Sequence, residues 1–179
     1  MKRTHRMNIA GVECDLPLCE VNEHLDIAAF ILFGNVEVTI AAARELVEKC
    51  PDFDVVVTPE AKSIPLAYEI SRQTGKPYIV ARKGTKVYMT DPIKVSVVSL
   101  TTQRPQELYL GREEVELMRG KKVLLVDDVI STGESIAALR ELVKEAEGEE
   151  VAAAAVLAEG EAADRKDIVF LEKLPVFPK

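Results

Sequence analysis

The sequence has few of the side chains on which much enzyme chemistry depends. Its 179 residues include two histidines, three cysteines and no tryptophan. A metal site built from several histidines, or a Ser-His-Asp triad, would have to use His5 or His24, and His5 lies in a segment expected to fray. We therefore expect chemistry that depends on neither.

The cysteines and the hydrophobic segments exclude further classes. Cys14, Cys19 and Cys50 form no Cys-x-x-Cys pair, so neither a zinc site nor a disulfide framework is indicated, and we interpret them as buried thiols. No segment approaches the roughly 20 apolar residues that cross a membrane. The basic start lacks the apolar run of a secretory signal. These observations predict a cytoplasmic protein with no membrane partner.

Charge and composition limit the partners and the number of domains. The chain has 23 Lys and Arg against 30 Asp and Glu, a formal net charge of -7. Binding to nucleic acid needs a concentrated basic face, so nucleic acid is not expected as a partner. With 47% hydrophobic residues the chain can fill one core, and we predict a single domain over 1–179.

Hydrophobic periodicity predicts alternating strands and helices. Apolar residues recur at spacings of four and three over 36–49, which indicates a helix that Pro51 ends. Short apolar strands are predicted at 53–58, 77–82, 122–126 and 151–157, with further helices at 64–73 and around 136–146. Residues 84–120 have strand-like pieces broken by turns. This alternation predicts an α/β fold, a doubly wound, mostly parallel sheet with helices on both faces.

The strongest functional signal is the segment VLLVDDVISTGES at 123–135. Four apolar strand residues lead to Asp127 and Asp128, and hydroxyl and glycine residues then precede a helix. Backbone N–H groups at a helix N-terminus hold phosphate, and neighbouring carboxylates accept hydrogen bonds from the hydroxyls of a sugar. The segment therefore predicts a site for a ribose 5-phosphate. The alternative is that Ser131 or Thr132 only caps the helix and the acids only end a strand.

Three segments resemble one family. Residues 123–135 resemble the signature of type I phosphoribosyltransferases, an apolar strand followed by Asp/Glu-Asp and a Thr-Gly-x-Thr/Ser turn. Residues 58–64 (TPEAKSI) resemble the pyrophosphate loop of the adenine and xanthine members. Residues 82–86 (RKGTK) are similar to the Arg-Lys-x-x-Lys run that opens their flexible loop.

The resemblance implies an activity and a set of roles. The implied activity is Mg²⁺-dependent transfer of ribose 5-phosphate from 5-phosphoribosyl 1-pyrophosphate (PRPP) to a purine base, in a homodimer. It also implies that 1–35 and 160–179 form a small hood or the edge of the sheet, and that 84–112 is a β-hairpin-like flexible loop. The implied 5′-phosphate site is Ile130, Ser131, Thr132, Gly133, Glu134 and Ser135, and the pyrophosphate site is Glu60, Ala61, Lys62 and Ser63. The implied catalytic groups are Asp127, Asp128, Arg82, Lys83 and Lys86, of which Asp127 and Asp128 are also the metal ligands.

Some of these roles have local conditions or structural alternatives. Arg82, Lys83 and Lys86 can instead be a solvated charge cluster at a strand end. Glu60 needs a cation or backbone N–H partners, because it would otherwise oppose the pyrophosphate. Glu134 must point away from a bound phosphate for the same reason.

The identity of the base stays open in the sequence. Phe33 and Val129 are the candidates to contact it, although Phe33 is also consistent with an ordinary core residue. Thr101 and Thr102 stand where adenine members usually have a Glu-Tyr pair, a departure that resembles the xanthine branch. Adenine is the first candidate, and xanthine or hypoxanthine and guanine are the alternatives.

Two other functions are compatible with the same fold. A regulator of this fold would sense PRPP or a nucleotide without turnover, and Thr58 to Leu66 resembles such relatives too. For a DNA-binding version, the roughly 25 residues before the predicted core leave no space for a helix-turn-helix segment. An unrelated nucleotide-binding α/β domain would need GxxxxGK[ST] or GxGxxG, and the sequence has neither.

Overall fold

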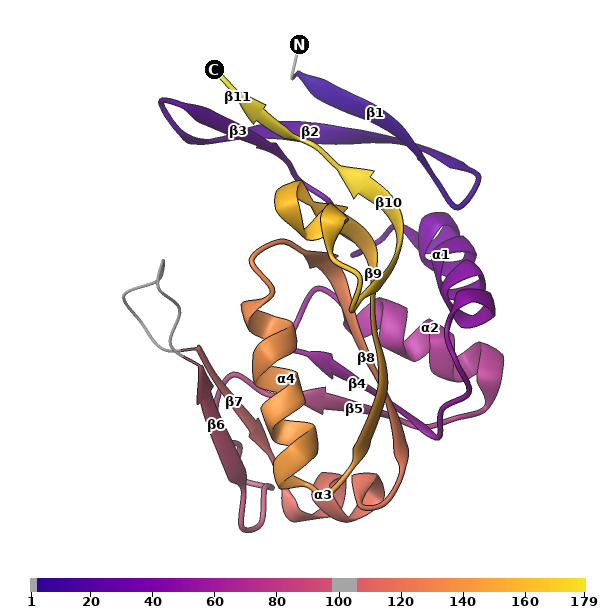
Figure 1. Cartoon of the computed structure of the whole chain (residues 1–179), viewed down its shortest axis with the longest axis vertical. Coiled ribbons are helices and arrows are strands. Elements are labelled where there is room, and N and C mark those ends of the chain that lie inside the picture. Colours follow the sequence, from indigo (N-terminus) through magenta and orange to yellow (C-terminus); the bar gives the residue numbers. More distant parts are fainter. Residues whose placement is uncertain (1–2, 98–105) are drawn as a thin grey trace.

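The centre of the protein is a five-stranded parallel sheet. The computed structural model describes residues 3–97 and 106–179. The strand order is β10-β9-β8-β4-β5, and every neighbouring pair is parallel. The strands are β4 (Val55–Pro59), β5 (Tyr78–Ala81), β8 (Lys122–Ile130), β9 (Glu149–Glu159) and β10 (Val169–Leu174). Figure 1 shows β8 and β9 running along the middle of the molecule.

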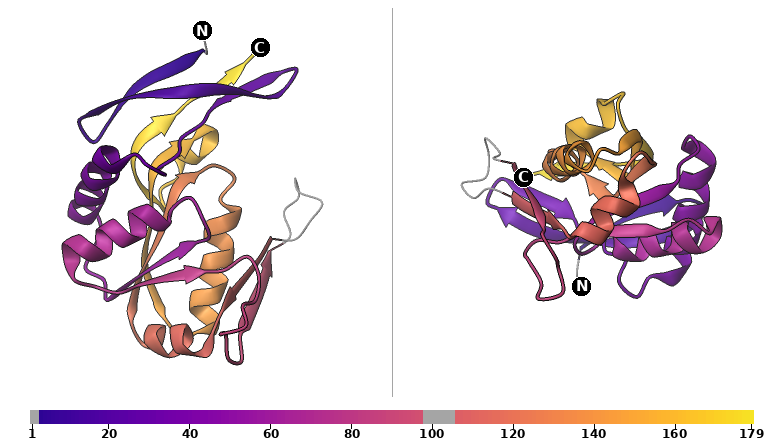
Figure 2. Two further views of the ribbon diagram at one scale, coloured as in Figure 1. Left: turned by 180° about the vertical axis from the view of Figure 1, so that it is seen from behind. Right: turned by 90° about the horizontal axis from the view of Figure 1, so that it is seen from below.

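Helices cover both faces of this sheet. On one face, α1 (Val36–Lys49) packs against α2 (Ile64–Thr74), β9 and β10, and α2 packs on β4, β5 and β8. On the other face, α4 (Glu134–Glu145) packs on β4, β8 and β9. Figure 2 shows α4 on the side of the sheet opposite to α1 and α2. The predicted fold class, a doubly wound parallel sheet, is confirmed.

The two helices on the first face have nearly the extents that the sequence predicts. The helix predicted for 36–49 is α1, with the same bounds, but its predicted apolar stripe was partly wrong. Val38, Ala42 and Leu46 are fully buried, whereas Val36 and Ile40, which the spacing of four and three placed on the stripe, are 66% and 40% exposed. Helix α2 ends at Gly75, whose φ of 71° is the left-handed conformation that glycine adopts without strain. The Gly75 N–H donates to Ser71 O at 2.8 Å and closes the last turn.

A second sheet joins segments from the two ends of the sequence. Its order is β1 (Thr4–Ile9), β2 (Val12–Asn22), β3 (Leu25–Ala28) and β11 (Val176–Pro178). Strand β11 pairs antiparallel with β3 of the same chain. A short 3₁₀ helix, η1 (Gly160–Asp164), connects β9 toward β10. Strands β1, β2, β3 and β11, which come from the two segments for which we expected a hood or edge, therefore lie together, above the central sheet in Figure 1. Strand β10, which also lies within 160–179, is instead an edge strand of the central sheet.

The predicted β-rich region at 84–120 contains a hairpin and also a helix. Strands β6 (Ile93–Val97) and β7 (Gln106–Leu110) pair antiparallel, as expected for a hairpin-like loop. Helix α3 (Arg112–Met118) follows them, and this part of the prediction was wrong. The turn residues around it obscured one short stripe, in which Val115 and Met118 are buried three residues apart. Thr101 and Thr102 lie outside the described residues.

Two further expectations need correction. Strand β8 continues to Ile130 instead of ending at Val126, because residues 127–130 keep pairing with β9. Asp127 and Asp128 therefore lie within the strand. Cys14 is buried, but Cys19 is exposed and Cys50 is half-buried, so not all three thiols are in the core. In the part of the chain that the structure describes, no helix is both long and apolar enough to span a bilayer.

Gly148, just before β9, gives a test of how tightly the core is packed. A Cβ on Gly148 would lie 3.0 Å from side-chain atoms of both Met118 and Val123, whereas a Cβ on Gly84 would meet nothing within 4 Å. We expect Gly148→Ala to lower the free energy of unfolding by about 1–3 kcal/mol through overpacking. Gly84→Ala, the matched control, should change it by less than about 0.5 kcal/mol. Urea denaturation measures both, and equal values for the two variants would contradict the packing at Gly148.

Candidate functional site

Two adjacent acids on β8 form the centre of the site. Pairing with β9 holds this part of the strand, with Asp127 opposite Ala155. The Asp127 and Asp128 residues are only 7% and 3% exposed. The backbone N–H of Asp128 donates to Asp127 Oδ1 at 2.9 Å, and Lys62 Nζ lies 2.8 Å from Asp128 Oδ2. The turn after β4 therefore provides the cation that faces the acids of β8.

The two acids differ in their electrostatic surroundings. Burial raises the pKa of Asp127 above its ordinary value, and the neighbouring charge of Asp128 raises it further. Lys62 opposes this shift, but its ammonium is in direct contact with Asp128. Asp127 therefore favours its protonated form unless a further positive charge or a set of hydroxyl donors arrives.

A cavity of about 150 Å³ opens in front of the acids. The residues that line it come from the turn after β4, from the segment after β5, and from the end of β8 and the start of α4. They are Pro59, Glu60, Ala61, Lys62, Ser63, Lys83, Asp127, Asp128, Val129 and Ser135. The predicted pyrophosphate residues and the predicted acidic pair are thus brought to one cavity, at the carboxyl edge of the parallel sheet, where ligands of such sheets bind.

Glu60 has both kinds of partner that we expected it to need. Its Oε2 accepts a hydrogen bond from the Lys83 backbone N–H at 3.0 Å, and its Oε1 lies 3.3 Å from Arg82 Nη2. The bond from Lys83, followed by the charges of Arg82 and Lys86, holds the pKa of Glu60 below its ordinary value, against the effect of burial. The Glu60–Ala61 peptide is cis. Arg82 is therefore engaged in holding Glu60, while Lys83 faces the cavity.

The turn between β8 and α4 encloses a second, smaller cavity of about 40 Å³. Its lining includes every residue predicted to bind a 5′-phosphate, Ile130, Ser131, Thr132, Gly133, Glu134 and Ser135. Gly133 has φ 82° and immediately precedes α4, so the first N–H groups of that helix lie at the turn. Asp127, Val129 and Ser135 line both cavities, which are therefore neighbours.

Three predicted residues have other positions or partners than their expected roles suggest. The Ser63 side chain is buried, and its hydroxyl accepts from Thr58 Oγ1 at 2.7 Å and donates to Pro59 O at 3.1 Å. Phe33 is 56% exposed and lines a separate apolar cavity between α1 and α2, away from Val129. Lys86 is half-buried, and its charge acts on Glu60.

The sequence interpretation missed two charged residues near the site. Arg165 follows η1, and its Nη1 would lie 2.2 Å from a Cβ placed on Gly133. Glu159 ends β9 and is half-buried, which raises its pKa, while Lys62 opposes the shift. Neither belongs to a local motif. The one available signal was the parallel-sheet prediction itself, since it places the end of the strand at 151–157 beside the end of the strand that carries the acids.

The donor set at the acids suits a hard divalent cation. Asp127 and Asp128 offer carboxylate oxygens, the ligands that Mg²⁺ prefers, and the raised pKa of Asp127 shows that positive charge is favoured beside it. Among the described residues, no cluster of three or more His, Cys, Asp or Glu side chains forms a site made by the protein alone. The pair therefore fits an ion that keeps several of its ligands from water and substrate.

The fold and the site define a doubly wound α/β protein with an acidic strand end and an anion-binding turn at the carboxyl edge of its sheet. The sequence pattern of the phosphoribosyl transferase domain matches residues 36–177. The chain belongs to this family.

The relatives include both enzymes and a transcriptional regulator. The chain is 37% identical over 108 residues to the adenine phosphoribosyltransferase of Thermotoga neapolitana, covering 60% of each protein. It is 41% identical over 88 residues to a hypoxanthine/guanine phosphoribosyltransferase of Methanothermococcus okinawensis, covering 49% of this chain and 44% of that protein. It is 30% identical over 133 residues to the purine biosynthesis transcriptional repressor PurR of Bacillus subtilis, covering 74% of this chain and 43% of that protein. The chain thus spans about half the length of these relatives.

Solved structures support the fold. Adenine phosphoribosyltransferase from Thermoanaerobacter pseudethanolicus superposes with a TM-score of 0.67 at 19% identity, covering 79% of this chain and 84% of that one. The enzyme from Leishmania tarentolae gives a TM-score of 0.67 at 18% identity, over 97% and 83% of the two chains. At these identities the likeness extends to the architecture alone.

The raised pKa of Asp127 predicts a specific dependence of stability on pH. The folded state retains a proton that the unfolded state releases, so the contribution of Asp127 is fully present below about pH 4 and is lost as the pH rises through the raised value. Asp127→Asn removes this loss. We expect the variant to melt about 2–4 °C above the parent at pH 8.5 and to lose this advantage at pH 4.

Asp164→Asn is the matched control, because the Asp164 side chain is 84% exposed. Its melting temperature should follow that of the parent at every pH, as measured by differential scanning calorimetry. A constant difference between Asp127→Asn and the parent from pH 4 to 8.5 would contradict the buried acidic pair.

Proposed function

We propose that the protein is a purine phosphoribosyltransferase that transfers the 5-phosphoribosyl group of PRPP to a purine base, with adenine first. One observation carries the proposal: the acids of β8 lie where two neighbouring cavities meet, since Asp127 lines both and Asp128 lines the larger one. The smaller cavity is lined by the anion-binding turn and the larger also by Lys62 and Lys83. A ligand with a phosphate at one end, vicinal hydroxyls in the middle and a second anionic group at the other end matches this order.

In the proposed reaction, the bond between C1 of the ribose and a pyrophosphate oxygen breaks, and a bond from C1 to a ring nitrogen of the purine forms. The imidazole N–H proton of the purine is released to the departing pyrophosphate or to water. Positive charge develops on the sugar, and the pyrophosphate leaves with the electron pair. Such a step depends mainly on positioning and electrostatic stabilisation. It needs no nucleophilic histidine or cysteine, which is consistent with a chain that has two histidines.

The residues of the site have distinct proposed roles. Asp127 and Asp128 accept hydrogen bonds from the ribose hydroxyls, and the same carboxylates would hold Mg²⁺. When bound, Mg²⁺ supplies positive charge to the pyrophosphate oxygens. Lys62 and Lys83, which line the larger cavity, neutralise the leaving group. The contribution of Arg82 to this role is indirect, because its guanidinium holds Glu60.

The choice of base rests on the relatives. One is an adenine phosphoribosyltransferase, and a second acts on hypoxanthine and guanine. A structural neighbour from Trypanosoma brucei is described in complex with AMP, pyrophosphate and ribose-5-phosphate. We therefore place adenine first, with hypoxanthine, guanine and xanthine as the other bases to be tested. Val129, which lines both cavities, stays the candidate contact for the base.

A second candidate is a regulator that binds PRPP or a nucleotide without turnover. The observation in its favour is the match to the repressor of purine biosynthesis, which extends over more of this chain than either enzyme match described above. The site would then be a sensor that uses the same turn and acids. Binding is common to both candidates, so turnover separates them.

An assay with four bases tests the enzyme. Protein, Mg²⁺ and PRPP are mixed with adenine, hypoxanthine, guanine or xanthine, and the release of pyrophosphate is measured. We expect the fastest release with adenine, and Asp128→Asn should lower kcat/KM by about 100-fold because it removes a charge that acts at the reacting sugar. Asp164→Asn should keep the parent rate. If no base gives release while PRPP still raises the melting temperature, the regulator is favoured.

The proposal includes a homodimer in the cytoplasm. An apolar cavity of about 340 Å³ lies between α1 and α2, and Phe33, Val36 and Tyr68 beside it are 56%, 66% and 55% exposed. Exposed apolar patches of this kind mark association surfaces. The exposed free thiol of Cys19 is suited to a reducing compartment.

Light scattering after size-exclusion chromatography measures the oligomer. We expect a dimer for the parent and a shift to monomer for Val36→Glu, because a buried unpaired charge at the interface costs several kcal/mol. Val21→Glu is the matched control, since Val21 is 54% exposed and lies on β2, away from α1 and α2. A parent that is monomeric, or a Val36→Glu variant that stays dimeric, would contradict this surface.

A further inference from the structure

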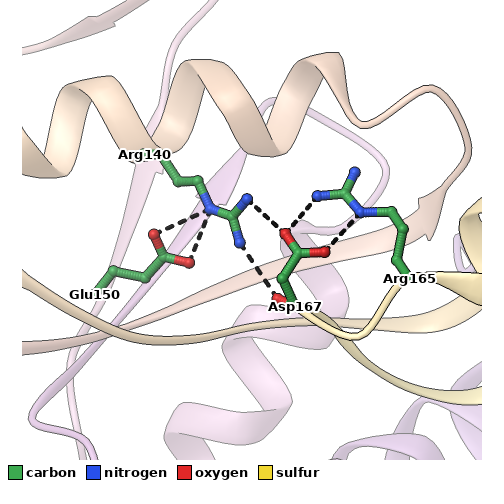
Figure 3. Close-up of polar contacts among 4 residues, drawn as sticks. All are labelled: Arg140, Glu150, Arg165 and Asp167. Carbon is green, nitrogen blue, oxygen red and sulfur yellow. Dashed lines mark hydrogen bonds and ion pairs between the residues drawn. The ribbon is translucent and has the colours of Figure 1, made fainter.

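A connected set of charged side chains links α4 to the segment after η1. Arg140 of α4 donates from Nε to both carboxylate oxygens of Glu150, at 2.9 and 3.1 Å, and from Nη1 to Asp167 at 2.8 Å. Arg165 donates to the two oxygens of Asp167 from Nε at 2.9 Å and from Nη2 at 2.7 Å. Figure 3 shows the two guanidinium groups on either side of Asp167.

This arrangement fixes the plane of the Arg165 guanidinium. Two parallel N–H···O bonds to one carboxylate define both the position and the orientation of an arginine. The Arg165 side chain is 29% exposed, so much of it lies against the protein. Asp167 is itself held by Arg140 of α4. The position of Arg165 is therefore fixed relative to α4, the helix that follows the phosphate-binding turn.

The remaining nitrogen of Arg165 packs on the turn. A Cβ on Gly133 would lie 2.2 Å from Arg165 Nη1, a distance that no real Cβ tolerates. Gly133 is favoured by its φ of 82°, and a side chain at this position would also have to displace the Arg165 guanidinium that occupies its space. The contact makes Arg165 a support for the residue that sets the left-handed bend of the turn.

The charges around the turn give this support a second consequence. The described residues that line the turn cavity include two acids, Asp127 and Glu134, and no lysine or arginine. A phosphate there would rely on neutral N–H and O–H donors and the helix dipole while facing the carboxyl groups of these two residues. The guanidinium of Arg165, packed on Gly133, adds positive charge beside them.

We propose that Arg165 is a positioning residue for the phosphate-binding turn, which it holds in shape through Gly133 and whose negative surroundings it offsets. The inference rests on the proposed function, because it assigns the turn to the 5′-phosphate of the substrate. Asp167 and Arg140 act one step further out, as the groups that hold Arg165.

The test compares two ligands that occupy different ends of the site. Ribose 5-phosphate and inorganic pyrophosphate, each with Mg²⁺, are titrated into the parent protein and into Arg165→Met, Arg165→Lys and Arg119→Met by isothermal titration calorimetry. Arg119→Met is the matched control, since Arg119 is also held by acids, Glu116 at 2.9 Å and Glu147 at 3.7 Å, but lies at the end of α3.

We expect Arg165→Met to raise the Kd for ribose 5-phosphate by about tenfold, as for the loss of a charge-assisted contact, and to leave the Kd for pyrophosphate unchanged. Arg165→Lys retains the charge without the planar fork and should recover part of the loss. Arg119→Met should match the parent for both ligands. Calorimetric melting of each variant verifies folding, and Arg165→Lys provides the comparison should Arg165→Met fail to fold.

The outcomes separate this inference from the function on which it rests. A parent protein that does not bind ribose 5-phosphate would overturn the proposed function and the inference together. Parent-like binding of ribose 5-phosphate by Arg165→Met, or equal weakening of both ligands, would overturn the inference alone. If Arg165→Lys binds ribose 5-phosphate as weakly as Arg165→Met does, the positive charge of Arg165 does not contribute to binding.

Discussion

Two carboxyl groups lie next to each other within a strand of the central sheet, where they are almost fully buried. Burying a carboxylate costs free energy, and the surrounding groups of the site compensate for that cost. Backbone pairing with β9 fixes their position, and Lys62 approaches from the turn after β4 to neutralise one of them. Among the described residues, no ion pair joins Asp127 to an ammonium, and burial together with the charge of Asp128 raises its pKa. A ligand that brings hydroxyl donors or a cation therefore stabilises the ionised form of Asp127, which is disfavoured in the free protein.

The same need for compensation recurs at the other acids of the site. Glu60 is held by Arg82 and the Lys83 N–H, and Asp167 by Arg140 and Arg165. At Glu60 the arginine is committed to the acid, and a different residue, Lys83, faces the cavity. At Asp167 one arginine does both, because Arg165 binds the acid through Nε and Nη2 and packs on the turn through Nη1. Distinguishing these structural arginines from the groups available to a ligand requires the contacts.

Features encoded within one short segment could be predicted from the sequence. The apolar spacing over 36–49 predicted the bounds of α1 but not its buried face, because Val36 and Ile40 are exposed. The apolar run before Asp127 predicted the strand and the turn, which depend on neighbouring residues along the chain. The family resemblance placed the 58–64 turn at the same cavity as the acids. The prediction ended β8 too early because carboxylates are rare inside strands, and only pairing with β9 shows that the ladder continues through them.

What the sequence could not supply are contacts between distant segments. Arg165 lies 32 positions from Gly133, and no spacing rule connects them. Phe33 is an aromatic residue just before a helix and was predicted to contact the base, yet it lines a cavity together with residues of α2. Helix α3 was hidden because seven residues contain a single buried pair, too little for a periodic signal.

The pairing of β11 with β3 has a kinetic meaning as well. These strands are separated by most of the chain, with the whole parallel sheet between them. The entropic cost of pairing these two strands falls only after the parallel sheet has formed and brought the two segments near each other. The upper sheet is therefore expected to assemble late and to open first, as a cooperative unit that can exchange its amide hydrogens while the layer beneath stays closed. Its closing completes an apolar core that it shares with the body, because Ile9, Leu16 and Phe30 belong to one buried cluster with Val38 and Leu46.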